Sequence, residues 1–145
     1  MREKRGLVYS IYSYSMGFRD NGLFAVYGGC SKENLKIAVD LTLSEMKAIR
    51  LHGITPEELY KGKEYLKGST VLGLESTGSR MGWLTRSEMY YDRVMTVDEV
   101  FDEIDKVTIG DIQELAQRMW GKQELSLAVI GPLKKKDLPI KELAC

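Results

Sequence analysis

An arginine and a tyrosine near the start of the chain have the types and spacing best suited to chemistry. Arg2 lies seven residues ahead of Tyr9, and Arg5 lies between them. Arginine is a planar donor that is always charged, and the tyrosine hydroxyl is a second donor, so together they suit the stabilisation of a carbonyl oxygen or a developing oxyanion. Both residue types are also common beside strands, so plain surface packing is the alternative interpretation.

Few other side chains have the pattern of a reactive site. A zinc site needs three or four ligands, normally with histidine or cysteine prominent, and the chain has one histidine and two cysteines. His52 precedes Gly53 at a predicted helix end, where a last-turn cation is expected. Cys30 has no base near it in sequence, which predicts a buried structural thiol. The sequence therefore predicts no catalytic residue and no metal site within this chain.

A β-hairpin is expected to position Tyr9. Residues 7–16 are rich in the aromatic and β-branched side chains of a strand. Residues 17–22 hold two glycines and an asparagine, which are suited to a turn, and residues 23–29 form the returning strand. Two strands alone are marginally stable in water, so this hairpin should pair with further strands or pack under helices.

Helices fill most of the remaining chain. Ser31 can begin a helix that Gly53 ends, and Thr55-Pro56-Glu57-Glu58 is a capping box that begins the next. Further helices are predicted from Ser76 or Thr77 to about Arg93, from Thr96 and from Thr108, and residues 125–130 form a short buried strand. This order predicts an α+β fold of two layers, with helices packed on one face of a small, mainly antiparallel sheet. Such a narrow sheet is expected to leave an unpaired edge.

Composition limits the class of protein and its partners. The 145 residues are 43% hydrophobic and are long enough for one domain with a substantial core. Lys plus Arg and Asp plus Glu both number 21, so no net charge attracts nucleic acid or an anionic membrane. No apolar run has the length of a membrane helix, and no secretory signal is seen. Two cysteines favour a reducing setting, and a cytoplasmic location is expected.

The order of several motifs resembles a known family. Arg2-Glu-Lys-Arg-Gly-Leu-Val-Tyr9 is similar to a motif in the non-catalytic regions of insulinase, pitrilysin and mitochondrial processing peptidase, a family of zinc peptidases with an inverted zinc motif. The resemblance continues through these segments, in the family's order: Asp20–Phe24, Thr55–Leu59, Leu74–Met81, Val107–Ile112 and Leu125–Pro132.

The family resemblance implies that zinc binding and substrate orientation belong to different domains. In that family a separate, earlier domain binds zinc through an H-x-x-E-H helix and a later glutamate, and this sequence has no such motif. The resemblance implies that residues 1–133 are the C-terminal part of the second, non-metal-binding domain, followed by a solvated tail at 134–145. It further implies that Arg2 and Tyr9 orient a peptide substrate and stabilise its oxyanion, and that zinc belongs to the catalytic domain of the longer protein.

Three functions follow as expectations. The first is a segment of a zinc metalloendopeptidase that is inactive alone and has as partners a catalytic domain, in the same or another protein, and a peptide substrate. The second is a non-catalytic scaffold or assembly subunit derived from the same family. The third is a free-standing module that binds extended peptides at an open strand edge. Exposed edges and uncovered helix faces also predict a homo-oligomer.

Overall fold

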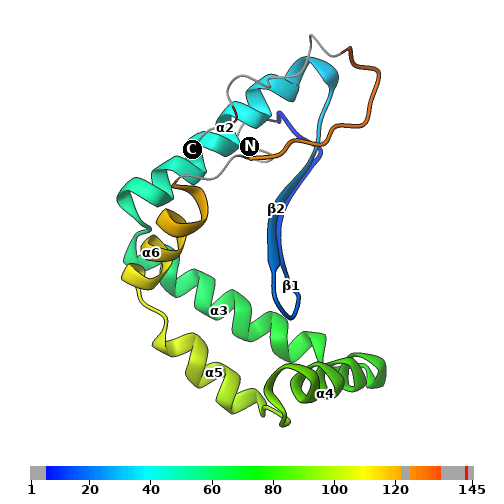
Figure 1. Cartoon of the computed structure of the whole chain (residues 1–145), viewed down its shortest axis with the longest axis vertical. Helices are drawn as coiled ribbons and strands as arrows, with labels where there is room; N and C mark the ends of the chain where they lie inside the picture. Colours follow the sequence, from blue (N-terminus) through cyan, green and yellow to red (C-terminus); the bar gives the residue numbers. More distant parts are fainter. Residues whose placement is uncertain (1–5, 122–124, 135–142, 144–145) are drawn as a thin grey trace. The chain divides into compact units, whose positions relative to one another are not determined.

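The computed structural model describes residues 6–121, 125–134 and 143. Its elements, coloured in chain order in Figure 1, form two compact units, each treated separately below. The first consists of Met1–His52 with Ala116–Cys145, and the second of Gly53–Leu115. The predicted boundary between residues 133 and 134 stays a prediction, because residues 135–142 lie outside the described residues.

The predicted hairpin is confirmed in the first unit. Strands β1 (Ser10–Gly17) and β2 (Gly22–Gly29) pair antiparallel. Tyr12 lies opposite Tyr27, and their rings stack with centroids 5.0 Å apart. Phe24 lies on the other face of the hairpin, and its ring packs 5.4 Å from that of Trp120. The aromatic side chains that predicted these strands therefore pack across the hairpin on one face and against a helix end on the other.

A short 3-10 helix and a long α-helix follow the hairpin. The 3-10 helix η1 (Lys32–Asn34) leads into α2 (Leu35–His52). Ala38 of α2 is buried, and the apolar side chains on the same helical face are half-buried, namely Leu35, Val39, Met46 and Ile49. His52 lies in the last turn of α2 as predicted, and Gly53 follows with φ +71°, the left-handed conformation that favours glycine at a helix end.

Capped helices make up the second unit: α3 (Pro56–Gly73), α4 (Thr77–Tyr91), α5 (Val97–Lys106) and most of α6 (Ile109–Trp120), whose last residues belong to the first unit. Thr55 and Thr96 form complete capping boxes with Glu58 and Glu99. At the start of α6, Asp111 occupies the position that a glutamate has in the other two capping boxes, and its carboxylate accepts a hydrogen bond from the Thr108 backbone N–H at 2.8 Å. The predicted helix starts at Thr55, Thr96 and Thr108 are thus confirmed, whereas Ser31 precedes the 3-10 helix η1 and makes no side-chain capping hydrogen bond.

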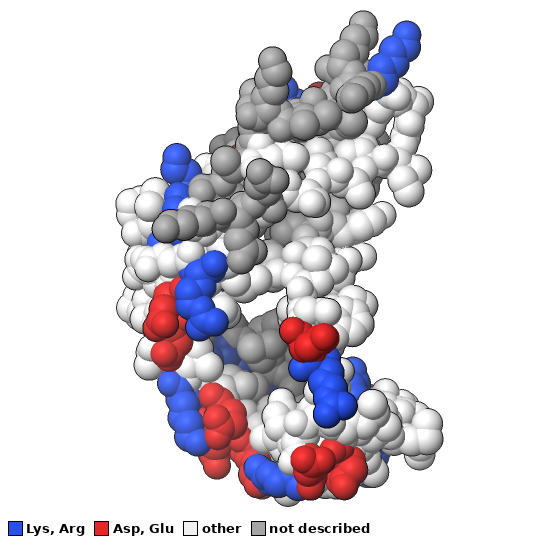
Figure 2. Space-filling view, in the orientation of Figure 1, with Lys and Arg blue, Asp and Glu red and all other residues white. Residues whose placement is uncertain are grey.

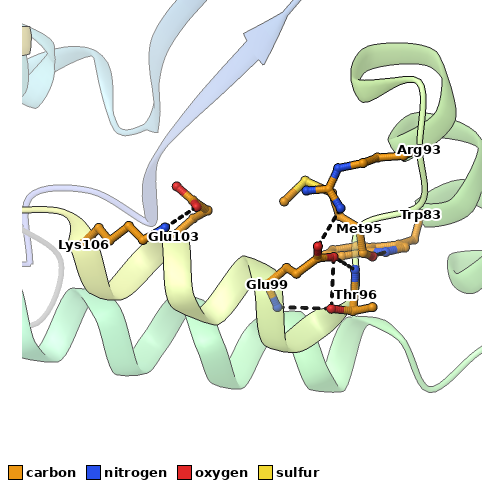
Figure 3. A network of polar contacts seen from close by, with 7 residues as sticks. All are labelled: Trp83, Arg93, Met95, Thr96, Glu99, Glu103 and Lys106. Carbon is orange, nitrogen blue, oxygen red and sulfur yellow. Dashed lines mark hydrogen bonds and ion pairs between the residues drawn. The ribbon is translucent and has the colours of Figure 1, made fainter.

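The α5 cap belongs to a wider polar network, shown in Figure 3. Glu99 accepts the Thr96 backbone N–H at 2.7 Å and the Arg93 guanidinium at 2.6 Å. The backbone hydrogen bond and, after it, the arginine hold the pKa of Glu99 below its usual value. Next to this cap, Trp83 of α4 donates its indole N–H to the Met95 carbonyl at 3.0 Å. These hydrogen bonds therefore connect the segment between α4 and α5 to both helices.

Helices α3 and α5 are joined by lysines. Lys67 contacts both carboxylate oxygens of Asp105 at 2.7 Å and lies 5.7 Å above the ring of Phe101. Lys63 donates to the Asp105 backbone carbonyl at 2.8 Å. The hydrogen bond to Asp105 raises the pKa of Lys67. The ammonium of Lys67 thus satisfies the carboxylate while its position over the ring adds a cation–π contact.

The predicted third strand is wrong. Residues 125–130 form no strand, and Ile130 is fully exposed at 103% of its reference area. Among the described residues the sheet therefore has two strands. An apolar run becomes a strand only where a neighbouring strand takes up its backbone hydrogen bonds, and neither edge of the hairpin does so for this segment. The α+β class holds, since helices accompany a small antiparallel sheet.

The expected substantial core is also absent from the described residues. Their buried hydrophobic side chains are Val8, Ala38 and Ala116, and Ser87 is a buried polar residue. Large apolar side chains such as Leu72 of α3 and Met81 of α4 are more than two-thirds exposed. Within the described residues, no helix combines the length and apolarity needed to cross a lipid bilayer.

Candidate functional site

Tyr9, the first predicted site residue, lies just before β1. Its backbone N–H donates to the Gly29 carbonyl at 2.7 Å, which continues the hairpin by one step. The preceding residue, Val8, is buried with 5% of its surface exposed, whereas Tyr9 is 76% exposed. The backbone of Tyr9 is thus held between a buried anchor and a strand, and its phenol is open to a ligand.

A side chain from η1 helps to fix this segment. Asn34 donates its side-chain amide N–H to the Leu7 carbonyl at 3.2 Å, over a sequence separation of 27 residues. Asn34 and Val8 are therefore positioning residues for Tyr9, and the sequence analysis missed both. A short-range motif could not have revealed the Asn34 contact, because its partner comes from before the hairpin.

Arg2, the other predicted site residue, lies outside the described residues, as does Arg5. The pairing of Arg2 with Tyr9 remains a prediction based on their spacing and on the family resemblance.

In the part of the chain that the structure describes, the remaining reactive side chains form neither a metal centre nor an activated nucleophile. Among the described residues, no group of three or more His, Cys, Asp and Glu side chains could hold a metal ion. Cys30, predicted to be buried, is a free thiol that is half-buried. A pocket of about 360 Å³ lies between the end of α3 and the start of α4. Glycines and hydroxyl side chains make up most of its lining, together with Trp83 and one charged residue, Arg86. It contains no side chain suited to act as a general base.

Similarity to known proteins supports the family resemblance. Residues 1–66 match the family model described as "Peptidase M16 inactive domain". An uncharacterized zinc protease of Streptomyces coelicolor is 43% identical over 137 residues, which cover 94% of this chain and 30% of the relative. An uncharacterized zinc protease of Bacillus subtilis is 33% identical over 132 residues, covering 91% and 32% respectively. The chain thus spans about a third of the length of these relatives.

A solved structure agrees on the fold. A chain of complex III2 from Candida albicans, solved with Inz-5 bound, superposes with a TM-score of 0.74 at 19% identity, covering 82% of this chain and 29% of that one. The hairpin followed by capped helices is therefore a fold that a solved structure shares. The matched inactive-domain model and the zinc-protease relatives place the chain in the insulinase and processing-peptidase (M16) family of zinc peptidases, as part of the inactive domain.

Proposed function

We propose that this chain contributes peptide-substrate binding and transition-state stabilisation to a zinc-dependent peptidase, without binding the metal. The observation that carries the proposal is the geometry of Tyr9, whose backbone is fixed by the hydrogen bond to Gly29 while its phenol is 76% exposed. A side chain that is open to solvent on a fixed backbone can reach a substrate carbonyl without rearrangement of the main chain.

Tyr9 and Arg2 have distinct roles in this proposal. The Tyr9 hydroxyl donates a hydrogen bond to the oxygen of the scissile carbonyl, where negative charge develops. Arg2 adds a permanent positive charge and orients the peptide backbone. A zinc ion in the catalytic domain of the same or a partner protein would supply the hydrolytic chemistry. The zinc-protease names of the relatives support the presence of that metal in the longer protein.

Turnover by the peptidase that contains this segment tests the proposal. Tyr9→Phe removes the donor and keeps the ring, so we expect kcat to fall by about 10²–10³, the usual cost of one oxyanion donor, with zinc content unchanged. Tyr65→Phe is a matched control, because Tyr65 of α3 is 74% exposed, and turnover should stay at the level of the unsubstituted protein. Equal turnover for Tyr9→Phe and the control would contradict the role of Tyr9.

A scaffold function is the second candidate. The observation that favours it is the structural likeness to a chain of a multi-subunit assembly, complex III2. A scaffold requires neither the Tyr9 hydroxyl nor an intact zinc motif elsewhere in the protein. Assembly that survives Tyr9→Phe, in a protein whose upstream zinc motif is broken, would support this function over the first.

We also propose that the chain self-associates. Its support is the number of large apolar side chains that the described residues leave exposed in both units. Light scattering of the purified chain should give a mass above that of the 16.5 kDa monomer, and a monodisperse monomer would contradict the proposal. Peptide binding at an open strand edge, the third expected function, would appear in calorimetry as heat on adding an extended peptide.

A further inference from the structure

Three consecutive residues at the entrance to the β1–β2 hairpin are each held by a different contact. The Leu7 carbonyl accepts a hydrogen bond from the side-chain amide of Asn34 at 3.2 Å. Val8 follows as a buried side chain, and the backbone N–H of Tyr9 donates to the Gly29 carbonyl at 2.7 Å. The main chain is therefore fixed at three successive residues, the last of which carries the exposed phenol.

Asn34 is itself held in place by its surroundings. It is the last residue of η1, and its backbone N–H donates to the Ser31 carbonyl at 3.2 Å. The helix α2 begins at the next residue and continues for 18 residues. Residues 30–34 thus form one short turn between Gly29, where β2 ends, and Asn34. The two hydrogen-bonding partners of the segment before β1 are therefore joined by that turn.

A glycine precedes the held segment. Gly6 has φ +60°, the left-handed conformation that other residues rarely adopt. A methyl group at Gly6 would meet nothing within 4 Å, so the backbone conformation, and not a lack of space, favours glycine there. Gly6 also lies between Arg2 and Tyr9 in the sequence. Its conformation therefore sets the direction in which the main chain enters Leu7.

Ion pairs with the hairpin strands do not contribute to this arrangement. Neither β1 nor β2 contains a charged residue, and in Figure 2 most of the surface over the hairpin strands is white. Among the described contacts, the hydrogen bonds at Leu7 and Tyr9 and the burial of Val8 therefore hold the segment.

We propose that Asn34 and Gly6 are positioning residues for the peptidase reaction, which act on turnover through the main chain of residues 7–9 and do not touch the substrate. This inference rests on the oxyanion role proposed above for Tyr9. A donor stabilises developing charge best when it is in place beforehand, and a displacement of about 1 Å can cost on the order of 10²-fold in rate. The contacts that fix the backbone of Tyr9 therefore belong to the reaction as well as to the fold.

Asn34→Asp, in the peptidase that contains this segment, is the main test. A carboxylate has nearly the shape of the amide but cannot donate to the Leu7 carbonyl, and a negative charge just before α2 favours that helix. The substitution thus removes the hydrogen bond without weakening α2. We expect kcat to fall about tenfold or more, the contribution of one such hydrogen bond, with KM and zinc content unchanged. Asn21→Asp at the exposed hairpin turn is the matched control and should keep full turnover.

A double-mutant cycle with Tyr9→Phe separates positioning from a purely structural effect. If Asn34 acts through the phenol of Tyr9, Asn34→Asp should lower kcat by less than about twofold once that hydroxyl is absent. A residue that only supports the fold would cost the same factor in both backgrounds, and that result would overturn the proposal.

Hydrogen exchange provides a measurement that needs no substrate. The Tyr9 amide proton, which is bonded to the Gly29 carbonyl, should exchange about tenfold faster in Asn34→Asp than in Asn21→Asp, because the segment opens more often. Equal exchange rates in the two variants would overturn the role of Asn34.

Gly6 provides a second pair of variants, which decides the question if Asn34→Asp does not fold, as judged by circular dichroism. Gly6→Ala strains the left-handed backbone and should lower kcat about fivefold or more. Gly6→Asn should retain most of the turnover, because asparagine tolerates this conformation. Equal turnover for these two variants would overturn the role of Gly6.

The outcomes distinguish this inference from the proposed function on which it rests. Full turnover for Tyr9→Phe would contradict the proposed function itself. A loss for Tyr9→Phe together with full turnover for Asn34→Asp would overturn only the positioning role.

Discussion

Two glycine-to-alanine substitutions should change the stability of this chain in opposite directions. Gly53 follows α2 with φ +71°, whereas Gly62 lies in the interior of α3. A methyl group at Gly53 would meet Gln113 and Ile109 at 3.5 Å, which is ordinary van der Waals contact, so backbone strain is its main cost. A methyl group at Gly62 would meet nothing within 4 Å.

The magnitudes follow from these backbone conformations. An L-residue in the left-handed region costs about 1–2 kcal/mol, partly offset by about 0.4–1 kcal/mol from the smaller entropy of the unfolded chain. We therefore expect Gly53→Ala to destabilise the chain by about 1 kcal/mol. Gly62→Ala should stabilise it by about 0.5–1 kcal/mol, the difference between glycine and alanine in a helix interior.

Urea and thermal unfolding, followed by far-ultraviolet circular dichroism, would measure both effects. The two variants should differ in Tm by roughly 5 °C for a chain of this size. Gly53→Asn is a control, since asparagine tolerates the left-handed region, and it should lose less stability than Gly53→Ala. A Gly53→Ala chain as stable as the unsubstituted one would refute the strain argument. A destabilising Gly62→Ala would mean that this face of α3 packs against another surface.

Two further predictions concern the helix caps. Thr96→Ala should cost about 1 kcal/mol in urea unfolding, because the Glu99 backbone N–H loses its acceptor, while Thr96→Ser should keep most of the stability; equal losses for both would contradict the cap. Capping hydrogen bonds lower the folded-state pKa values of Glu58, Glu99 and Asp111, so their contribution is present above the unfolded pKa values, near 4, and is lost as the pH falls through the lower folded values. Unfolding curves measured from pH 7 down to about 3 should show this decline, and stability that rises on acidification would contradict the sign.

Local patterns in the sequence determined most of the secondary structure. The capping boxes at Thr55 and Thr96 and the glycine at position 53 act through contacts within a few residues, so their positions could be predicted without a structure. The hairpin likewise follows from a turn between two runs of strand-forming residues. The absence of a zinc motif and the order of the family motifs could also be found in the sequence alone.

The packing of distant segments was decided only by the tertiary structure. Asn34 reaches the Leu7 carbonyl, and Lys67 reaches Asp105, over separations of 27 and 38 residues that no local pattern encodes. The apolar run at residues 125–130 has the composition of a strand, but among the described residues it pairs with neither strand of the hairpin. Hydrophobic periodicity indicates which side chains could be buried, but burial requires a second surface that packs against them. For most large apolar side chains, the described residues provide no such surface.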